Sequence, residues 1–367
     1  MAKAVTLPST LHPSSGGRGT SSNATGRYES LAREAFDDGW EIDEGRPALK
    51  TQVTRDTTRT IIARNQSPDI SFDRSINPYR GCEHGCSYCF ARPTHAYLGL
   101  SPGRDFETKL FAKPDAAKLL DAELRAPSYR PKVLAMGTNT DPYQPIERTW
   151  KVTRSVIEVL QAFNHPVSIV TKSNLILRDI DILAPMAELR LTKAFLSVTT
   201  LDRALARAME PRAATPARRL DAVRSLAAAG VPVGVMMGPV IPGLNDHELE
   251  AIAEAAAEAG AKSFGTVLLR LPLEIKDLFR EWLEAQVPDR AKRVIKLLRE
   301  MRGGKDYDAR WFERGTGRGP MAELIAQRAA LARKRFGLDG PPTVLDIRRF
   351  RAPPRPPKPG DQMELAL

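Results

Sequence analysis

The sequence predicts an α/β protein with a parallel β-sheet and helices packed outside it. Short apolar runs alternate with amphipathic helical segments along the middle of the chain, and about six such strand–helix units fit there. The composition, 42% hydrophobic and 27% charged over 367 residues, suits a chain that buries a core, which excludes global disorder. Six units are too few for a closed eight-strand barrel. Periodicity alone therefore leaves a partial barrel or an open doubly wound sheet.

The individual units follow from apolar spacing and from capping residues. Val152 and Val156 recur at helical spacing, and Gly230 and Gly260 stand where two helices should end in the left-handed conformation. Asn245 is the expected N-cap of the helix that Gly260 ends. The expected strands are residues 133–136, 167–171, 194–198, 231–240 and 267–271, and the helices that follow them are residues 147–163, 179–189, 216–229, 245–259 and 275–285.

Composition divides the chain into five segments. The first is rich in Ser, Thr and Gly and is expected to be disordered, and the last is rich in Pro and is expected to be an extended linker. The segments are a disordered N-terminal segment at 1–27, an N-terminal extension at 28–70, the sheet with its helices at 71–288, a basic helical extension at 289–350 and the tail at 351–367.

The formal net charge of +11 is concentrated towards the C-terminus. Residues 276–351 hold 19 basic and 11 acidic residues, so this stretch alone carries +8. Two helices are expected there, at 290–302 and 319–336, and the first has a basic stripe. A basic surface attracts phosphate backbones, but it is also typical of arginine-rich proteins with an ordinary solvated face. Both interpretations remain open from charge alone.

Three classes of protein are excluded by what the sequence lacks. Three Cys residues are too few for a disulfide scaffold. The sequence contains no run of about 18 apolar residues, which is the length needed to span a membrane. Its N-terminus lacks the apolar segment of a signal peptide. The sequence therefore predicts a soluble cytoplasmic protein.

All three cysteines lie within eight residues, in the segment Cys82-Glu-His-Gly-Cys86-Ser-Tyr-Cys89. A zinc site would combine the three thiolates with His84 or His95. A redox pair would use Cys86 and Cys89. An iron–sulfur cluster would take three thiolates and leave one iron open to a small chelating molecule. The spacing alone leaves these three chemistries in competition.

The pattern C-x-x-x-C-x-aromatic-C resembles the motif of the radical S-adenosylmethionine (radical SAM) family. The flanks Asn77-Pro-Tyr-Arg-Gly-Cys82 and Tyr88-Cys-Phe-Ala-Arg92, continued by Pro93-Thr-His-Ala-Tyr97, resemble the spore-photoproduct-lyase branch. Within that branch they are similar to an uncharacterised bacterial subfamily. The resemblance covers about residues 60–290 and favours the iron–sulfur interpretation of the cysteines.

The resemblance implies a partial (β/α)6 barrel over residues 71–288 and a [4Fe-4S] cluster on Cys82, Cys86 and Cys89. It also implies that S-adenosylmethionine chelates the open iron and that an external one-electron donor of the flavodoxin or ferredoxin type reduces the cluster. Cleavage would yield a 5′-deoxyadenosyl radical that abstracts hydrogen from the substrate. The residues implied for holding S-adenosylmethionine are Tyr88, Thr138, Asn139, Asp141, Lys172, Ser173, Ser197, Glu210 and Arg219.

Several of these positions have a second interpretation. Asp141 can accept a charge-assisted hydrogen bond from the methionine amino group, or it can form an Asx turn before Pro142. Lys172, at the end of an expected strand, suits the methionine carboxylate. Tyr88 suits the adenine or packs the loop, and Ser197 suits a ligand contact or is a satisfied buried hydroxyl.

The sequence departs from the lyase in one respect. The lyase carries a hydrogen-donating cysteine at the end of its second strand, where residues 135–141 of this chain contain no cysteine. If all three thiols hold the cluster, none is left to return a hydrogen atom. The resemblance therefore extends to radical generation and not to repair of the thymine dimer.

The C-terminal residues suggest a partner. Gln362, Leu365 and Leu367 resemble the short motif that docks on the bacterial replication sliding clamp, with a frayed apolar tail as the alternative. This motif and the basic stretch favour DNA or RNA as the substrate, in repair or modification. A radical enzyme for a protein or small metabolite, and a non-catalytic Fe–S or zinc module, are the competing hypotheses.

Overall fold

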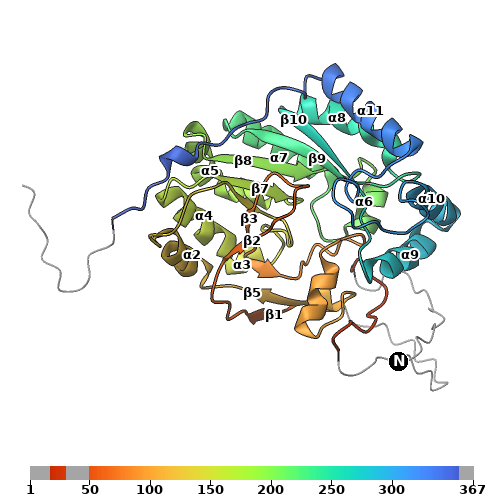
Figure 1. Ribbon diagram of the computed structural model, residues 1–367, viewed down its shortest axis with the longest axis horizontal. Coiled ribbons are helices and arrows are strands. Elements are labelled where there is room, and N and C mark those ends of the chain that lie inside the picture. The colour runs from red at the N-terminus through yellow and green to blue at the C-terminus, as the bar shows by residue number, and fades with distance from the viewer. Residues whose placement is uncertain (1–16, 30–48, 355–367) are drawn as a thin grey trace, which may run out of the picture.

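The computed structural model describes residues 17–29 and 49–354. A seven-stranded sheet in the order β10-β9-β8-β7-β6-β3-β2 forms its centre (Figure 1). Every neighbouring pair is parallel except β2 with β3, so the sheet contains six parallel strands. The strands are β2 (Ile62–Arg64), β3 (Arg74–Ile76), β6 (Leu134–Met136), β7 (Val167–Thr171), β8 (Thr192–Ser197), β9 (Val233–Val240) and β10 (Ser263–Leu268). The predicted parallel α/β fold is confirmed.

Helices cover the outer face of this sheet, and their apolar stripes form the main core (Figure 1). In α4, for example, Val152, Val156 and Leu160 are buried, as their spacing predicts. The outer helices are α2 (Ala116–Leu124), α4 (Val152–Ala162), α5 (Ile180–Glu188), α7 (Pro216–Ala228), α8 (Leu249–Glu258) and α11 (Pro320–Arg335).

Further helices and a second sheet complete the described chain. The remaining α-helices are α1 (Asp105–Thr108), α3 (Glu147–Trp150), α6 (Arg203–Met209), α9 (Ile275–Gln286) and α10 (Pro288–Glu300). The 3-10 helices are η1 (Arg92–Leu98), η2 (Asn174–Asp179), η3 (Asp246–Glu248) and η4 (Ile347–Arg349). A small second sheet has the order β1-β5-β4, with β1 (Gln52–Arg55), β5 (Lys109–Ala112) and β4 (Tyr79–Arg80).

One loop shows that the large sheet is curled. Residues 301–319, between α10 and α11, contact the β10 edge, where Leu268 N donates to the carbonyl of Gly315 at 2.8 Å. The same loop contacts the β2–β3 connection at the opposite edge, where Phe312 N donates to Asp69 Oδ1 at 2.7 Å and Arg314 pairs with Asp69. Phe312 and Gly315 are only three residues apart, so they can contact the two edges only if those edges approach each other. The architecture is therefore a partial barrel of six parallel strands.

Three expected elements differ in detail. The helix expected at 147–163 is two helices, because the Glu147 carboxylate accepts the Thr153 N–H and Lys151 turns the chain at φ 50°. The strand expected at 267–271 is β10, which ends at Leu268. Asn245 does not cap a helix with its side chain; it accepts from Ile241 N and donates to two carbonyls at the strand ends.

The N-terminal residues 17–27 differ from the expected disorder. Arg18 is buried and donates to the carbonyls of Glu107 (2.9 Å) and Leu49 (2.6 Å), and Gly19 N donates to Glu107 Oε2 at 2.8 Å. A polar segment can thus be fixed by hydrogen bonds to a buried carboxylate, which composition does not reveal. Residues 1–16 lie outside the described residues, and so do Gln362, Leu365 and Leu367 of the proposed clamp motif.

A second core lies at the C-terminal ends of the parallel strands. The helices α9 and α10 pack there, and Phe279, Trp282 and Leu298 join a buried cluster that also contains Cys86 and Tyr88. The cysteine loop is therefore packed against the basic helical extension. In the described part of the chain, no helix is both long enough and apolar enough to cross a membrane.

Candidate metal and cofactor site

The three cysteines lie on the loop between β4 and η1, shortly after the C-terminal end of β3. Cys82 and Cys86 are buried, and Cys89 is partly exposed. The backbone N–H groups of Gly85 and Cys89 donate to the carbonyls of Cys82 and Cys86, each at 3.3 Å, so the loop is two successive turns. Gly85 has a φ of +68°, a conformation that other residues rarely adopt. All three thiols thus emerge from one compact loop.

Two of the three thiols lie where burial disfavours their ionised form. Burial raises the pKa of Cys82 well above its ordinary value, and burial also raises the pKa of Cys86 against the opposing charge of Lys172. Bound iron would supply the positive charge that stabilises the thiolates. No three His, Cys, Asp or Glu side chains converge on one ion among the described residues, as a mononuclear zinc site requires. A cluster instead binds each thiolate through a different iron.

A buried ion pair lies beside the aromatic residue of the cysteine loop. Glu210, which directly follows α6, accepts hydrogen bonds from Tyr88 Oη, from Thr199 Oγ1 (2.7 Å) and from the Arg219 guanidinium. Burial opposes ionisation of Glu210, but the charges of Arg219 and Lys172 outweigh it and lower the pKa of Glu210 to about 2. Arg219 also donates to the Ser197 carbonyl at 2.9 Å. The pair fixes Tyr88 against the end of β8.

The ammonium group of Lys172 lies near Tyr88 and Glu210. It follows β7 directly, and its Nζ lies 5.8 Å from the centre of the Tyr88 ring. Burial disfavours its charge, but the charges of Cys86 and Glu210 outweigh burial and raise the pKa of Lys172. No carboxylate of the described residues pairs with this ammonium group within 4.0 Å. Lys172 is therefore a buried, charged donor beside the cysteine loop.

Both carboxylate oxygens of Asp141 accept hydrogen bonds from other groups of the protein. Its two oxygens accept from Tyr143 N (2.9 Å), Thr171 Oγ1 (2.7 Å) and Lys172 N (2.8 Å), and His84 Nδ1 lies 3.3 Å away. Burial opposes its ionisation, but the neighbouring His84 and these hydrogen bonds lower the pKa of Asp141 to about 2. The Asx turn is present, and Asp141 ties the ends of β6 and β7 to the cysteine loop.

Comparisons with known proteins identify the family. Residues 76–256 match the model of the radical SAM superfamily. An uncharacterized protein of Mycobacterium tuberculosis is 38% identical over 232 residues, which cover 63% of this chain and 68% of the relative. The chain belongs to the radical SAM superfamily. Another uncharacterized protein, from Methanocaldococcus jannaschii, is 27% identical over 58% of this radical SAM chain and 76% of its own length.

Solved structures share the radical SAM fold of this chain. A mutant of spore photoproduct lyase is 18% identical with a TM-score of 0.54, over 78% of this chain and 79% of that one. Another, described as having bound AdoMet and dinucleoside spore photoproduct, is 17% identical with a TM-score of 0.54, over 77% and 78% of the two chains. At these identities the likeness concerns the fold alone.

The other implied ligand residues are spread along the strand ends of the radical SAM barrel. Thr138 Oγ1 and Asn139 N lie 3.4 and 3.1 Å from Asn77 Oδ1, which ties the β6 end to the start of the cysteine loop. Ser173 Oγ accepts from Leu175 N and caps η2. Ser197 is the buried last residue of β8. Tyr88, Glu210, Arg219 and Lys172 are thus the residues that the fold gathers most closely.

The sequence did not reveal that Arg92 and Glu107 support the cysteine loop of this radical SAM chain. Arg92 is fully buried; its Nε donates to the Cys86 carbonyl at 2.9 Å and its Nη2 pairs with Glu107 at 2.5 Å. Glu107 accepts in turn from Gly19 and Thr20. The signal was Arg92 itself, which lies three residues after Cys89, but its partner Glu107 lies 15 residues from it in sequence, and Gly19 lies 88 residues from Glu107.

We expect Gly19→Ala to release the N-terminal segment from the cysteine loop. A Cβ at Gly19 would lie 1.5 Å from the Gly85 carbonyl oxygen, so the backbone at Gly19 would have to move away from the cysteine loop. Limited proteolysis should then cut this segment faster in Gly19→Ala than in the unmodified protein. Gly340→Ala is the matched control because its Cβ would meet nothing within 4 Å. Equal cleavage rates for the two variants would contradict the packing.

Proposed function

We propose that this chain holds a [4Fe-4S] cluster on Cys82, Cys86 and Cys89 and cleaves S-adenosylmethionine reductively to start hydrogen abstraction. The supporting observation is the loop of three buried or half-buried thiols at the strand ends of a six-stranded barrel, beside Lys172, which pairs with no carboxylate of the described residues. When reduced by an external donor of the flavodoxin or ferredoxin type, the cluster would supply the electron that yields a 5′-deoxyadenosyl radical.

The protein residues would bind and orient. Lys172 would pair with the methionine carboxylate, and Thr138 and Asn139, at the open end of β6, would offer polar contacts. Tyr88 would face the nucleoside, held by Glu210 and Arg219, while Ser173 and Ser197 complete the polar lining. Asp141 would act by positioning Lys172 and the loop, because its own oxygens are already used. The second core of α9 and α10 would exclude water from the cysteine side.

We expect Lys172→Met to weaken S-adenosylmethionine binding about tenfold or more, because a charge-assisted contact is lost. The protein would be reconstituted anaerobically, and binding would be measured by equilibrium dialysis. Iron content should match the unmodified protein, since Lys172 holds no iron in this proposal. Unchanged affinity at full iron content would exclude Lys172 from the ligand site.

Release of 5′-deoxyadenosine by the dithionite-reduced protein is the direct test of the proposed reaction. Tight zinc binding without cleavage would instead support a non-catalytic module. The substrate class is a separate question, and a nucleic acid is one candidate, with a protein or small metabolite as the alternative. In a solved structure of similar fold, spore photoproduct lyase holds bound AdoMet and a dinucleoside.

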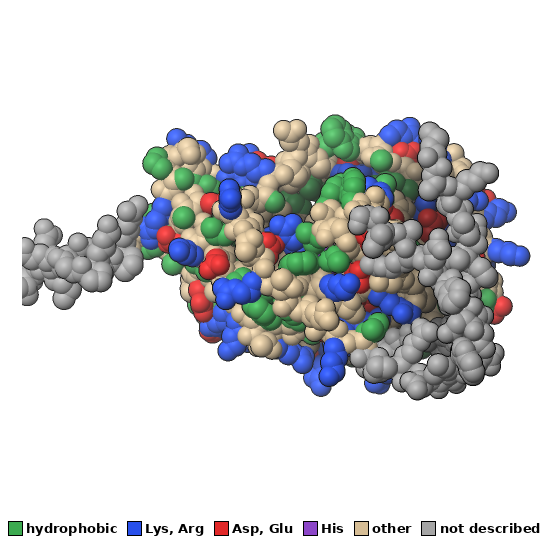
Figure 2. Space-filling view, turned by 90° about the horizontal axis from the view of Figure 1, so that it is seen from below, with side chains coloured by type: hydrophobic (Ala, Val, Ile, Leu, Met, Phe, Trp, Pro, Cys, Tyr) green, Lys and Arg blue, Asp and Glu red, His purple; other side chains and the backbone are tan. Residues whose placement is uncertain are grey.

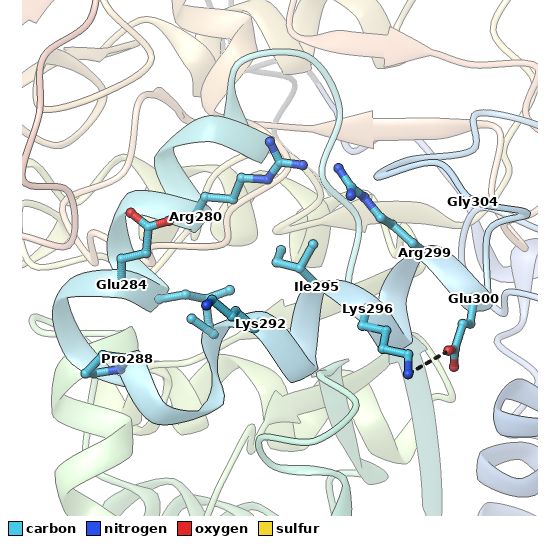
Figure 3. A pocket seen from close by; sticks show the side chains of 11 residues that line it. Arg280, Glu284, Pro288, Lys292, Ile295, Lys296, Arg299, Glu300 and Gly304 are labelled. Atoms are coloured by element: carbon cyan, nitrogen blue, oxygen red, sulfur yellow. Dashed lines mark ion pairs between the residues drawn. The ribbon is translucent and has the colours of Figure 1, made fainter. Parts of the chain in front are cut away.

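The positive charge of the basic helical extension supports a nucleic acid as the substrate only in part. Lys and Arg side chains are scattered over the face seen in Figure 2, interspersed with acidic ones. A groove of about 760 Å³ lies between α9 and α10 and is lined by Lys292 and Lys296 (Figure 3). Its arginines, Arg280 and Arg299, both pair with Asp306, at 2.6 and 2.7 Å. The groove is thus partly neutralised, and salt-sensitive binding of an oligonucleotide is the test of this candidate.

A further inference from the structure

Two arginines that pair with no carboxylate of residues 17–29 and 49–354 lie near the end of β10. Arg270 is two residues after β10, and Arg302 is two residues after α10. Among the described residues Arg270 makes no hydrogen bond or ion pair. Arg302 donates only through Nη2, to the carbonyls of Leu269 (2.6 Å) and Arg314 (3.1 Å). The carbonyl of Leu269, the neighbour of Arg270, thus brings the second guanidinium to the same loop.

Arg302 differs from the other two fully buried arginines of the described residues. Arg92 and Arg219 are each paired with a buried glutamate. Arg302 is only 1% exposed, yet its Nε and Nη1 have no partner in the part of the chain that the structure describes, and Arg270 Nε has none there either. The nearby carboxylate of Asp308 is taken by Arg310 at 2.6 Å. Buried unpaired donors are costly, so this pair indicates a missing anionic group.

The surroundings strengthen this interpretation. Burial, together with the positive charge of Arg270, lowers the pKa of Arg302, while Tyr307 and Asp308 oppose that effect. Two like charges are therefore held near each other in a poorly solvated place. A bound anion would relieve both their repulsion and the unpaired N–H groups.

Arg270 also lies beside the cysteine loop. Its Cζ is 4.7 Å from the centre of the Phe90 ring, and Phe90 directly follows Cys89. A guanidinium stacked on a ring keeps its edge free for a planar or tetrahedral anion. Phe90 is itself 42% exposed, so the stack faces solvent. An anion held by Arg270 would lie next to the loop on which the radical chemistry is proposed.

Two exposed aromatic residues stand on the loop that Arg302 anchors. Trp311 is 57% exposed and Phe312 is 68% exposed. Phe312 has a φ of +65°, which is rare for an aromatic residue, and Asp69 fixes its N–H at 2.7 Å. The loop therefore presents these rings in a defined place. Adjacent exposed rings near arginines are the arrangement that stacks the bases of single-stranded nucleic acids.

We propose that Arg270 and Arg302 bind a phosphate group of a nucleotide whose base stacks on Trp311 or Phe312. The phosphate belongs to a single-stranded nucleic acid or to a phosphorylated small molecule, and the two rings favour the former. This proposal rests on the proposed function only where it treats the bound nucleotide as the substrate. Binding of the nucleotide by the two arginines does not require cleavage of S-adenosylmethionine. None of these four residues lines the groove between α9 and α10, whose arginines are already paired.

The test is fluorescence anisotropy of the reconstituted protein with a short single-stranded oligonucleotide, with inorganic phosphate as a competing probe. Arg270→Gln should weaken oligonucleotide binding about tenfold and reduce the slope of log affinity against log salt by about one. Arg335→Gln, an exposed position on α11, is the matched control and should change the affinity little. Trp311→Ala should weaken oligonucleotide binding without changing competition by phosphate.

The outcomes separate the alternatives. If Arg270→Gln weakens phosphate and oligonucleotide equally and Trp311→Ala changes neither, the ligand is a phosphorylated small molecule. Oligonucleotide affinity that falls equally in Arg270→Gln and Arg335→Gln would overturn the site, because only overall charge would matter. Unchanged affinity in Arg270→Gln would overturn it as well, with water satisfying the arginines. Failure of S-adenosylmethionine cleavage with Arg270-dependent binding intact would overturn the proposed reaction alone.

Discussion

Cys86→Ala should leave the reconstituted protein without its cluster and without S-adenosylmethionine cleavage. Cys86 is the central thiol of the loop, and its carbonyl is fixed by Arg92, so neither of the other cysteines can replace it. Iron content should fall to background, and no 5′-deoxyadenosine should form. The fold should persist, because an alanine suits this small buried position.

Ser87→Ala is the matched control for that experiment. Ser87 is the neighbouring residue, it is fully buried, and its hydroxyl has no hydrogen-bond partner among the described residues. This variant should keep its iron and its activity. A Cys86→Ala protein with unchanged iron, or an equal loss in Ser87→Ala, would contradict the assignment of the thiols.

Glu210→Gln should destabilise the protein by about 3–5 kcal/mol, because Arg219 would stay buried without its partner. Urea denaturation measures this loss. Asp221→Asn is the control: Asp221 forms an exposed ion pair with Arg224 at 2.8 Å, so its removal should cost at most about 1 kcal/mol. Thr199→Ala, which removes one hydrogen bond to Glu210, should give an intermediate loss of about 0.5–1.5 kcal/mol.

The same carboxylate should affect stability in acid. The ordinary pKa is 4.5, and in the folded protein it is lowered to about 2. A carboxylate with a lowered pKa stabilises the folded protein at any pH above its ordinary pKa. That stabilisation is lost as the pH falls from about 4.5 towards about 2. Glu210→Gln should therefore lose less stability over this pH range than the unmodified protein. Parallel acid profiles would contradict the ion pair.

Strong local patterns predicted most of the barrel. The strand β7 is a β-branched run with buried and half-buried residues in alternation, and α4 has its apolar residues at helical spacing. The strand β3 escaped prediction because its three residues, Arg74 to Ile76, carry no period. It is a strand because it pairs with β6, which is a tertiary effect.

The candidate site was predictable where residues are close in sequence or match a family motif. The cysteines needed only spacing, and Lys172 needed only its place at a strand end. The sequence did not reveal that the oxygens of Asp141 are taken by Thr171 and Lys172 N, because those bonds join two strands. Nor did it reveal that Glu107 supports the loop through Arg92. Buried polar networks depend on partners that only folding brings together.

The loop that bridges the two edges of the sheet has a kinetic consequence. Its contacts join Ser67 and Asp69 to residues 243 to 247 positions later. Contacts of such sequence separation form late, because a long loop must be closed first. On the ribosome the seam of the barrel cannot close until Arg314 has emerged. The cysteine loop and most of the strands are therefore synthesised well before closure, which leaves an interval in which a cluster could be inserted into an open barrel.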